Sequence, residues 1–200
     1  MTLAERLRAA LVAPHAEAPI LIPSDSRDPN VDPNSAWTEA AVLVAVTDRA
    51  RPGIILTQRT DQLKRHAGQV AFPGGRIDPG DVSPEAAALR EAMEEIALDP
   101  TQVDLVGAAD RYRTVTGFQV TPVLGVVPPD LPLIPAPGEV SAIFEVPLDF
   151  LFDDANHQEV SVEWQGRMRH YYEFFWEDRR IWGATAAMIV NLSRRLRWLA

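Results

Sequence analysis

Cysteine is entirely absent from this chain of 200 residues. Disulfide bonds and thiolate zinc sites are therefore excluded, and any catalytic nucleophile must be something other than a thiol. The sequence also lacks an apolar run of about 18 residues, which is the length that a membrane-spanning helix requires. We therefore expect no membrane span.

Basic residues are scarce relative to acidic ones. The chain has 19 Lys and Arg residues against 28 Asp and Glu residues, which gives a formal net charge of −9. Such a charge repels a nucleic-acid backbone, so we expect no nucleic-acid partner. The first residues, from about 2 to 13, interleave charges with leucines and lack the apolar core of a signal peptide. This pattern predicts an amphipathic helix and a cytoplasmic protein, and nothing indicates an oligomeric state.

The remaining sequence is typical of one globular domain over residues 1–200, with a Pro-rich connection at about 19–37. A helix is predicted from Ser83, as N-cap, to about Leu98, and a second at 183–199 near the end of the chain. Strands surround the first of these helices, so we expect a mixed α/β layered domain. The predicted strands lie at 39–48, 53–59, 103–109, 118–127 and 140–147, with a hairpin at 160–175.

The predicted central helix carries an unusual concentration of carboxylates. Glu91, Glu94 and Glu95 lie three or four residues apart and share one helix face. Like charges at this spacing disfavour a helix by roughly 0.2–0.5 kcal/mol per pair, whereas a bound divalent cation would reverse that sign. Oxygen ligands of this kind indicate Mg²⁺ or Mn²⁺. A solvated helix face is the alternative reading of the same residues.

Two adjacent glycines, Gly74 and Gly75, precede this helix and are predicted to end a short strand. Glycine permits backbone angles and close approaches that other residues do not, so a carbonyl here is a candidate metal ligand. A plain turn is the alternative.

The strand, glycines, acidic loop and helix together resemble the Nudix box. "REAMEEIAL" supplies Arg90, Glu91, Glu94 and Glu95 at the spacing of that family. The interval from Gly75 is one residue longer than the general pattern, so that Asp81 stands where the loop glutamate is expected, and the penultimate glycine is Ala97. Both departures are expected of the coenzyme A pyrophosphatase branch. The resemblance implies a Nudix-type α-β-α sandwich with a mixed sheet.

The residues before the box strengthen the resemblance to this branch. "ILTQRTDQLKRHAGQVAFPGG", at 55–75, is similar to the motif that members hydrolysing coenzyme A carry there. Lys64 occupies the basic position where the family usually has arginine, with Arg65 next to it. Coenzyme A carries a pyrophosphate and a 3′-phosphate, so an acidic protein needs local cations to bind it. The expected substrate-binding residues are Arg59, Lys64 and Arg65, together with Gly74 and Gly75.

The resemblance also implies roles for the residues of the acidic helix. Glu91 and Glu95 are expected to hold Mg²⁺ or Mn²⁺ with Gly75, while Glu94 is a third ligand or orients the attacking water. Arg90 is expected to position Glu91 by a charge-assisted hydrogen bond. The general base stays open among Glu94, Glu139 and another residue.

Three functions are compatible with the sequence. The first is hydrolysis of coenzyme A or acyl-coenzyme A to 3′,5′-ADP and 4′-phosphopantetheine. The second is a Nudix hydrolase acting on another nucleoside diphosphate derivative, such as ADP-ribose or NADH. The third is a nucleotide-binding module without catalysis, against which the complete set of Arg90, Glu91, Glu94 and Glu95 speaks.

Overall fold

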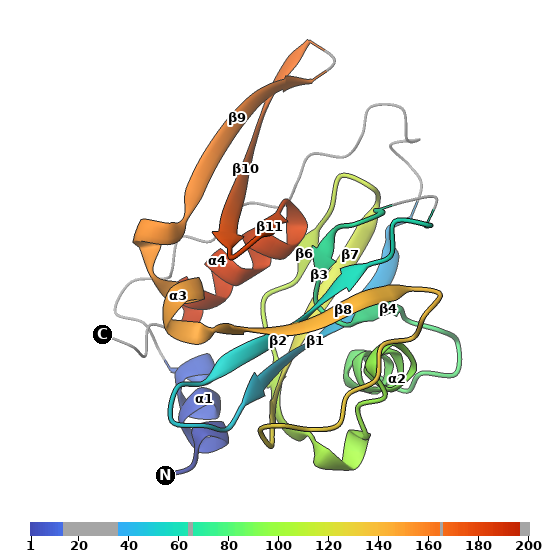
Figure 1. Cartoon of the computed structure of the whole chain (residues 1–200), viewed down its shortest axis with the longest axis vertical. Helices are drawn as coiled ribbons and strands as arrows, with labels where there is room; N and C mark the ends of the chain where they lie inside the picture. Colours follow the sequence, from blue (N-terminus) through green and yellow to red (C-terminus); the bar gives the residue numbers. More distant parts are fainter. Residues whose placement is uncertain (14–35, 64–65, 165, 197–200) are drawn as a thin grey trace.

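The computed structural model describes residues 1–13, 36–63, 66–164 and 166–196 (Figure 1). The Pro-rich connection predicted at about 19–37 falls almost wholly outside these residues, as do Lys64 and Arg65. The helices are α1 (Leu3–Val12), α2 (Pro84–Ile96), α3 (Leu148–Phe152) and α4 (Ala184–Leu196), with short 3₁₀ turns at Pro100–Gln102 and Asp154–Asn156. The strands are β1 (Thr38–Thr47), β2 (Gly53–Arg59), β3 (Val70–Ala71), β4 (Gly74–Arg76), β5 (Asp104–Ala108), β6 (Tyr112–Arg113), β7 (Phe118–Val127), β8 (Val140–Pro147), β9 (Gln158–Trp164), β10 (Arg167–Trp176) and β11 (Arg179–Trp182).

The main sheet is mixed. Its eight strands follow the order β3-β2-β1-β7-β5, with β4 paired to β1, β6 to β7 and β8 to β2. The central pair, β1 and β7, is parallel over its full length, from Thr38 opposite Phe118 to Thr47 opposite Val127. The other pairings in this sheet are antiparallel. A second sheet of three strands has the order β11-β10-β9.

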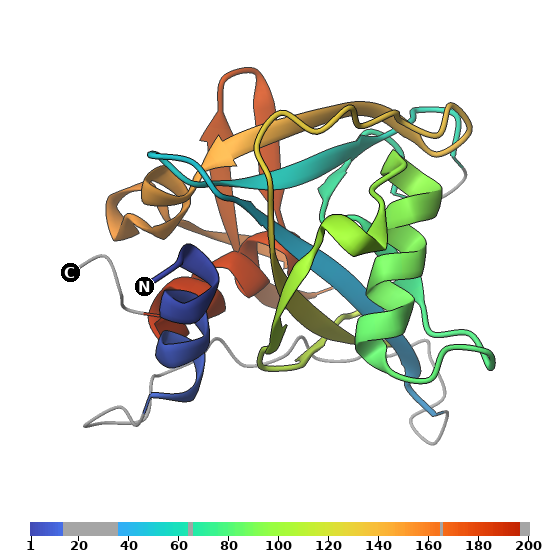
Figure 2. The ribbon, with the colours of Figure 1, turned by 90° about the horizontal axis from the view of Figure 1, so that it is seen from below.

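Helices cover both faces of the main sheet, as Figure 2 shows: α2 lies on one face, and α1 and α4 lie on the other. Strand β1 explains this layering because apolar side chains point to both of its faces. Ala40, Val44 and Val46 belong to the core on the α1 and α4 side. Leu43 and Ala45 belong to the core on the α2 side. The expected α-β-α sandwich with a mixed sheet is confirmed.

Most predicted elements are found close to their predicted bounds. The strands predicted at 118–127 and 140–147 are β7 and β8. The central helix is α2, which ends at Ile96, two residues before the predicted end at Leu98. Strands β6 and β11 and helix α3 were not predicted, because each is too short to show a periodic pattern. Among the described residues, no helix is long and apolar enough to span a membrane.

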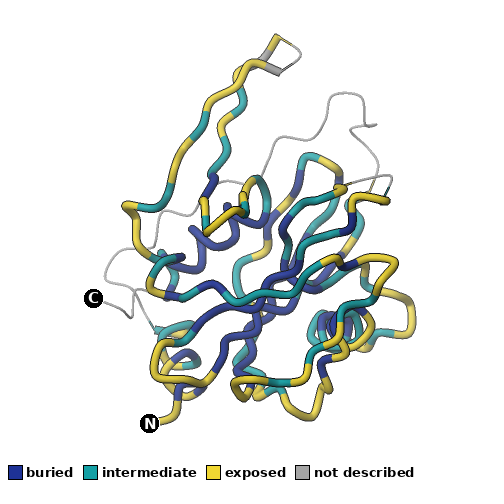
Figure 3. The backbone as a smooth tube through the Cα atoms, viewed as in Figure 1, coloured by how far each residue is buried: buried dark blue, intermediate teal, exposed yellow. Residues whose placement is uncertain are grey.

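The β9–β10 hairpin extends away from the rest of the molecule (Figure 1). Its base is buried, since Phe174 on β10 and Ile181 on β11 are fully enclosed. Its outer half is mostly exposed or half-buried (Figure 3). Helix α4, by contrast, lies deep in the core for most of its length.

Candidate active site

Helix α2 begins as the sequence predicts. The Ser83 hydroxyl accepts a hydrogen bond from the Ala86 N–H, and Pro84 fills the first helical position, where no N–H is required. The helix ends at Ala97, which takes the left-handed conformation with φ 53°. The apolar side chains of α2 pack into the core on this side of the main sheet, and Glu91 and Glu95 face the two glycines of strand β4.

The glycine pair lies inside strand β4 and does not end a strand, so that part of the sequence prediction was wrong. Gly74 pairs with Val42 and Gly75 with Ala41. A Cβ atom at Gly74 would lie 2.4 Å from the Ala41 carbonyl oxygen, and the φ of Gly74 is 153°. Glycine is needed here because β4 approaches β1 too closely for any side chain.

The same two glycines bring the backbone against the carboxylates of α2. The N–H of Gly74 donates a hydrogen bond to Glu95 Oε2 at 3.1 Å. A Cβ at Gly75 would lie 2.6 Å from the Glu91 carboxyl carbon. Glu91 therefore occupies the space that a side chain at position 75 would fill, and both glutamates meet the glycine pair.

Glu95 is the most deeply buried of the three glutamates, with its side chain 5% exposed. Burial raises its pKa to about 7, although the hydrogen bond from Gly74 and the charge of Arg59 act in the opposite direction. Desolvation also raises the pKa of Glu91, and Arg90 lowers it in part. The negative charge of Glu139 raises the pKa of both groups. Three carboxylates from two segments therefore act on one another at this site.

Arg59, at the end of β2, belongs to the same site. Its Nη1 lies 3.7 Å from Glu95 Oε1. Its buried Nε has no hydrogen-bond partner among the described residues. The side chain as a whole is 27% exposed, so other N–H groups of its guanidinium can reach a bound anion.

Glu139 reaches the site through the connection between β7 and β8. The Ala136 N–H donates to the Glu95 carbonyl, and the Glu139 N–H donates in turn to the Ala136 carbonyl. The Glu139 carbonyl accepts from the N–H of Thr60, next to Arg59. These bonds tie the loop to both α2 and β2, so Glu139 is held next to the carboxylates of α2.

Arg90 organises a second acidic group on the outer side of α2. It donates to Glu91 Oε1 at 3.0 Å and to Glu94 Oε2 at 3.0 Å. It also forms a two-pronged pair with Asp81, from Nε at 3.1 Å and from Nη2 at 3.0 Å. The expected hydrogen bond between Arg90 and Glu91 is thus present in the structure.

Asp81 had no assigned role in the sequence, and the structure supplies one. Its side chain is 7% exposed, and it accepts a further hydrogen bond from the Asp78 N–H at 2.8 Å. The hydrogen bond from Arg90 holds the pKa of Asp81 below its usual value. Asp81 therefore anchors Arg90 from the loop before the helix. Its position where the Nudix pattern has a glutamate was the only signal in the sequence.

Comparison with known proteins identifies the family. Residues 37–165, well over half of the chain, match the NUDIX domain. The chain belongs to the Nudix domain family. It is 43% identical over 158 residues to NudL, named as an uncharacterized Nudix hydrolase, of Escherichia coli strain K12/DH10B, covering 79% of this chain and 82% of the relative. The NudL of Shigella boydii serotype 4 matches with the same identity and coverage.

A solved structure has a similar fold. A Nudix hydrolase from M. smegmatis, RenU, superposes with a TM-score of 0.51 at 20% identity, covering 64% of this chain and 81% of that one. This likeness bears on the fold alone. The family assignment makes the chain a Nudix hydrolase that acts on a pyrophosphate bond in a nucleoside diphosphate derivative.

Nudix hydrolases generally use divalent metal ions, and the donor chemistry here fits one. Glu91 and Glu95 offer carboxylate oxygens in a partly desolvated site beside the glycine pair, as a hard cation prefers. As the side chains stand, no group of three His, Asp or Glu residues in the described part of the chain is arranged around a single point. Arginines pair with the carboxylates instead, and Glu94, 59% exposed, turns toward Arg90.

The structure thus brings together most of the residues predicted for the site. Arg59, Gly74, Gly75, Glu91 and Glu95 meet at one place, and Arg90 supports Glu91. Glu94 lies on the outer side of the helix, although it belongs to the same motif. Lys64 and Arg65 lie outside the described residues, so their predicted contact with phosphate stays a prediction.

Proposed function

We propose that this Nudix hydrolase cleaves the pyrophosphate of coenzyme A or acyl-coenzyme A, releasing 3′,5′-ADP and 4′-phosphopantetheine or its acyl form. One observation carries the proposal. Arg59, from the motif at 55–75 that resembles the coenzyme A branch, lies beside Glu95 of the Nudix helix. The substrate motif and the acidic helix therefore contribute to a single site.

Charge supports an anionic substrate at this place. The chain has a net charge of −9, so phosphate binding needs local cations. Arg59, Lys64 and Arg65 form a basic stretch directly before β3 and the glycine pair. The guanidinium of Arg59, whose side chain is 27% exposed, is a suitable donor to a phosphate oxygen.

Catalysis requires charge neutralisation on the pyrophosphate, which a bound Mg²⁺ or Mn²⁺ would supply. Glu91 and Glu95 would hold the ion, with the Gly75 carbonyl as a further ligand and Arg90 fixing the orientation of Glu91. Arg59 would bind the nonbridging oxygens. Among the candidates for general base, Glu139 is better placed than Glu94. The charge of Glu139 acts on both Glu91 and Glu95, whereas Glu94 acts on Glu91 and pairs with Arg90.

The products test this proposal directly. Coenzyme A should yield 3′,5′-ADP and 4′-phosphopantetheine, and an acyl substrate should keep its acyl group, because the site is built for the phosphoanhydride and not for the thioester. In ¹⁸O-labelled water we expect the label in 3′,5′-ADP, detected by mass spectrometry. Excess EDTA should abolish turnover, and Mg²⁺ or Mn²⁺ should restore it.

Two outcomes would contradict the proposal. Release of inorganic phosphate with dephospho-coenzyme A, or of a free thiol from an acyl substrate, would assign a different reaction. Rapid hydrolysis of ADP-ribose or NADH without hydrolysis of coenzyme A would favour the second function. Label in 4′-phosphopantetheine would change only the phosphorus that is attacked.

A further inference from the structure

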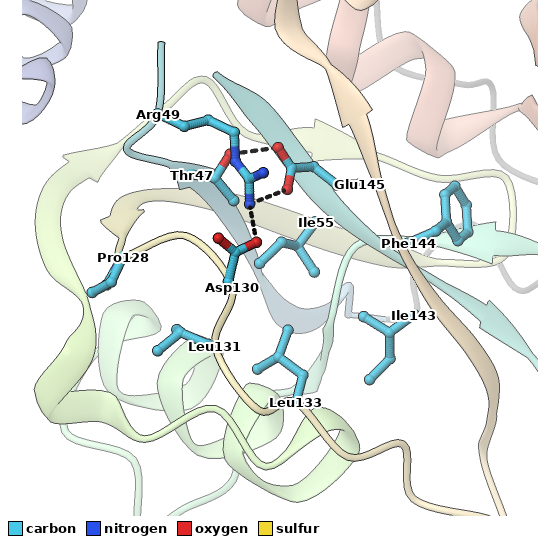
Figure 4. A pocket seen from close by; sticks show the side chains of 10 residues that line it. All are labelled: Thr47, Arg49, Ile55, Pro128, Asp130, Leu131, Leu133, Ile143, Phe144 and Glu145. Atoms are coloured by element: carbon cyan, nitrogen blue, oxygen red, sulfur yellow. Dashed lines mark hydrogen bonds and ion pairs between the residues drawn. The ribbon is translucent and has the colours of Figure 1, made fainter. Parts of the chain in front are cut away.

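A cavity of about 250 Å³ lies on the α2 side of the main sheet, apart from the acidic site (Figure 4). One wall is apolar and includes Ile55, Leu131, Leu133 and Ile143. The other wall is polar and consists of Thr47, Arg49, Asp130 and Glu145, with Pro128 and Phe144 completing the lining. Pockets for drug-sized ligands measure about 300–1,000 Å³, so this one accommodates part of a molecule.

The polar wall of the cavity is internally paired. Glu145 accepts a hydrogen bond from the Thr47 hydroxyl at 2.6 Å and forms an ion pair with Arg49 at 3.1 Å. Arg49 also pairs with Asp130 at 3.1 Å. One cation faces two carboxylates, so the polar wall carries a net negative charge and disfavours an anion. Together with the apolar wall, this charge favours an apolar group that bears no negative charge.

Two paired strands connect the cavity to the acidic site. On β2, Ile55 pairs with Glu145 of β8, and both line the cavity. Two residues further along β2, Thr57 pairs with Ile143, which also lines the cavity. Arg59 follows on the same strand and reaches Glu95 on α2. At roughly 3.3 Å per residue, the cavity lies about 7–13 Å from Arg59 along β2.

The loop between β7 and β8 joins the same two places. Leu131 and Leu133 line the cavity near the start of this loop, and Glu139 stands beside Glu95 at its end. The part of β8 between the cavity and the acidic site carries Ile143, which is half-buried, and Ser141, which is exposed. This part of the sheet is therefore in part accessible. A substrate held at Glu95 can extend along this part of the sheet.

The phosphopantetheine arm has the reach to do so. Its backbone holds about as many atoms as four amino-acid residues, which span roughly 14 Å when extended. We propose that the cavity receives the acyl group of an acyl-coenzyme A whose pyrophosphate lies between Arg59 and Glu95. The cavity then selects neutral acyl chains of limited length, and this selection rests on the proposed function.

The test compares kcat/KM for coenzyme A, hexanoyl-coenzyme A and adipoyl-coenzyme A, which ends in a carboxylate. In the unmodified enzyme, hexanoyl-coenzyme A should be preferred over adipoyl-coenzyme A. Leu133→Trp places a larger side chain in the cavity and leaves less room for an acyl chain. The kcat/KM for hexanoyl-coenzyme A should therefore fall about tenfold as burial of methylenes is lost, while the kcat/KM for coenzyme A changes less than about twofold. Leu133→Ala enlarges the cavity and should shift the preferred chain to a longer one.

The neighbouring residue provides a matched control. Ile134 follows Leu133 in the same loop, is 65% exposed and does not line the cavity. Ile134→Trp should therefore leave the ratio of kcat/KM for hexanoyl-coenzyme A to kcat/KM for coenzyme A unchanged. The acyl assignment is wrong if Leu133→Trp lowers kcat/KM equally for hexanoyl-coenzyme A and for coenzyme A. It is also wrong if Leu133→Ala leaves the preferred acyl-chain length unchanged. If the unmodified enzyme hydrolyses neither coenzyme A nor its acyl derivatives, the proposed function fails as well.

Discussion

Glu94 and Glu95 are neighbours on helix α2, yet they lie in opposite environments. Glu95 is 5% exposed and has a pKa raised to about 7 by burial. Glu94 is 59% exposed and pairs with Arg90. Glu95 thus keeps its carboxylate buried at a cost in folding energy, whereas the carboxylate of Glu94 lies largely in solvent. A cost of this kind is typical of functional sites, which is consistent with the proposed role of Glu95 in binding or catalysis.

The largest effect is expected from changing the two neighbours separately. Glu95→Gln keeps the shape and the acceptor for Gly74 but removes a ligand charge, so kcat should fall on the order of a hundredfold or more. Glu94→Gln should reduce kcat by less than about tenfold, because its carboxylate lies outside the desolvated site. Steady-state kinetics at saturating Mg²⁺ decide this. Equal losses would show that the exposed side of the helix takes part in the chemistry as fully as the buried side.

The next effect concerns the pH dependence of metal-free stability. The pKa of Glu95 rises from 4.5 to about 7 on folding. The folded state therefore binds the proton more tightly, and the free energy of unfolding should decrease as pH rises from about 4.5 to 7. A shift of this size corresponds to about 3 kcal/mol.

Denaturant unfolding in EDTA across this pH range measures the loss of unfolding free energy. Glu95→Gln should flatten the dependence of this free energy on pH, because the glutamine side chain does not titrate. Glu94→Gln is the matched control and should leave the profile of the unmodified protein in place. An unchanged slope in Glu95→Gln would mean that Glu95 is not the group responsible.

The smallest effect concerns the outer acidic group. Asp81→Asn removes the charge that holds Arg90, which in turn orients Glu91, so kcat should fall about tenfold with little change in KM. Asp78 is 64% exposed and lies 3.7 Å from Arg90. The kcat of Asp78→Asn should therefore stay within about twofold of the value for the unmodified enzyme. If Asp78→Asn and Asp81→Asn behave alike, the two-pronged pair with Arg90 has no role in positioning Glu91.

The sequence predicted the helix that carries the site, because its signals are local. Ser83 and Pro84 define the start of α2, and the spacing of Glu91, Glu94 and Glu95 follows from the helical repeat alone. The long apolar runs of β7 and β8 were equally readable. These features depend on neighbours in the chain, so one sequence was sufficient to find them.

Only the tertiary structure decided which carboxylates of α2 are buried and which partners each of them has. The three glutamates have the same chemistry and nearly the same place in the helix, and their difference arises from β4 packing against one side. The Gly74–Gly75 pair was read as the end of a strand because its true partner, β1, lies more than thirty residues away in the chain. Asp81 and Glu139 likewise gain their partners through folds of the chain, since desolvation and pairing depend on distance in space and not along the sequence.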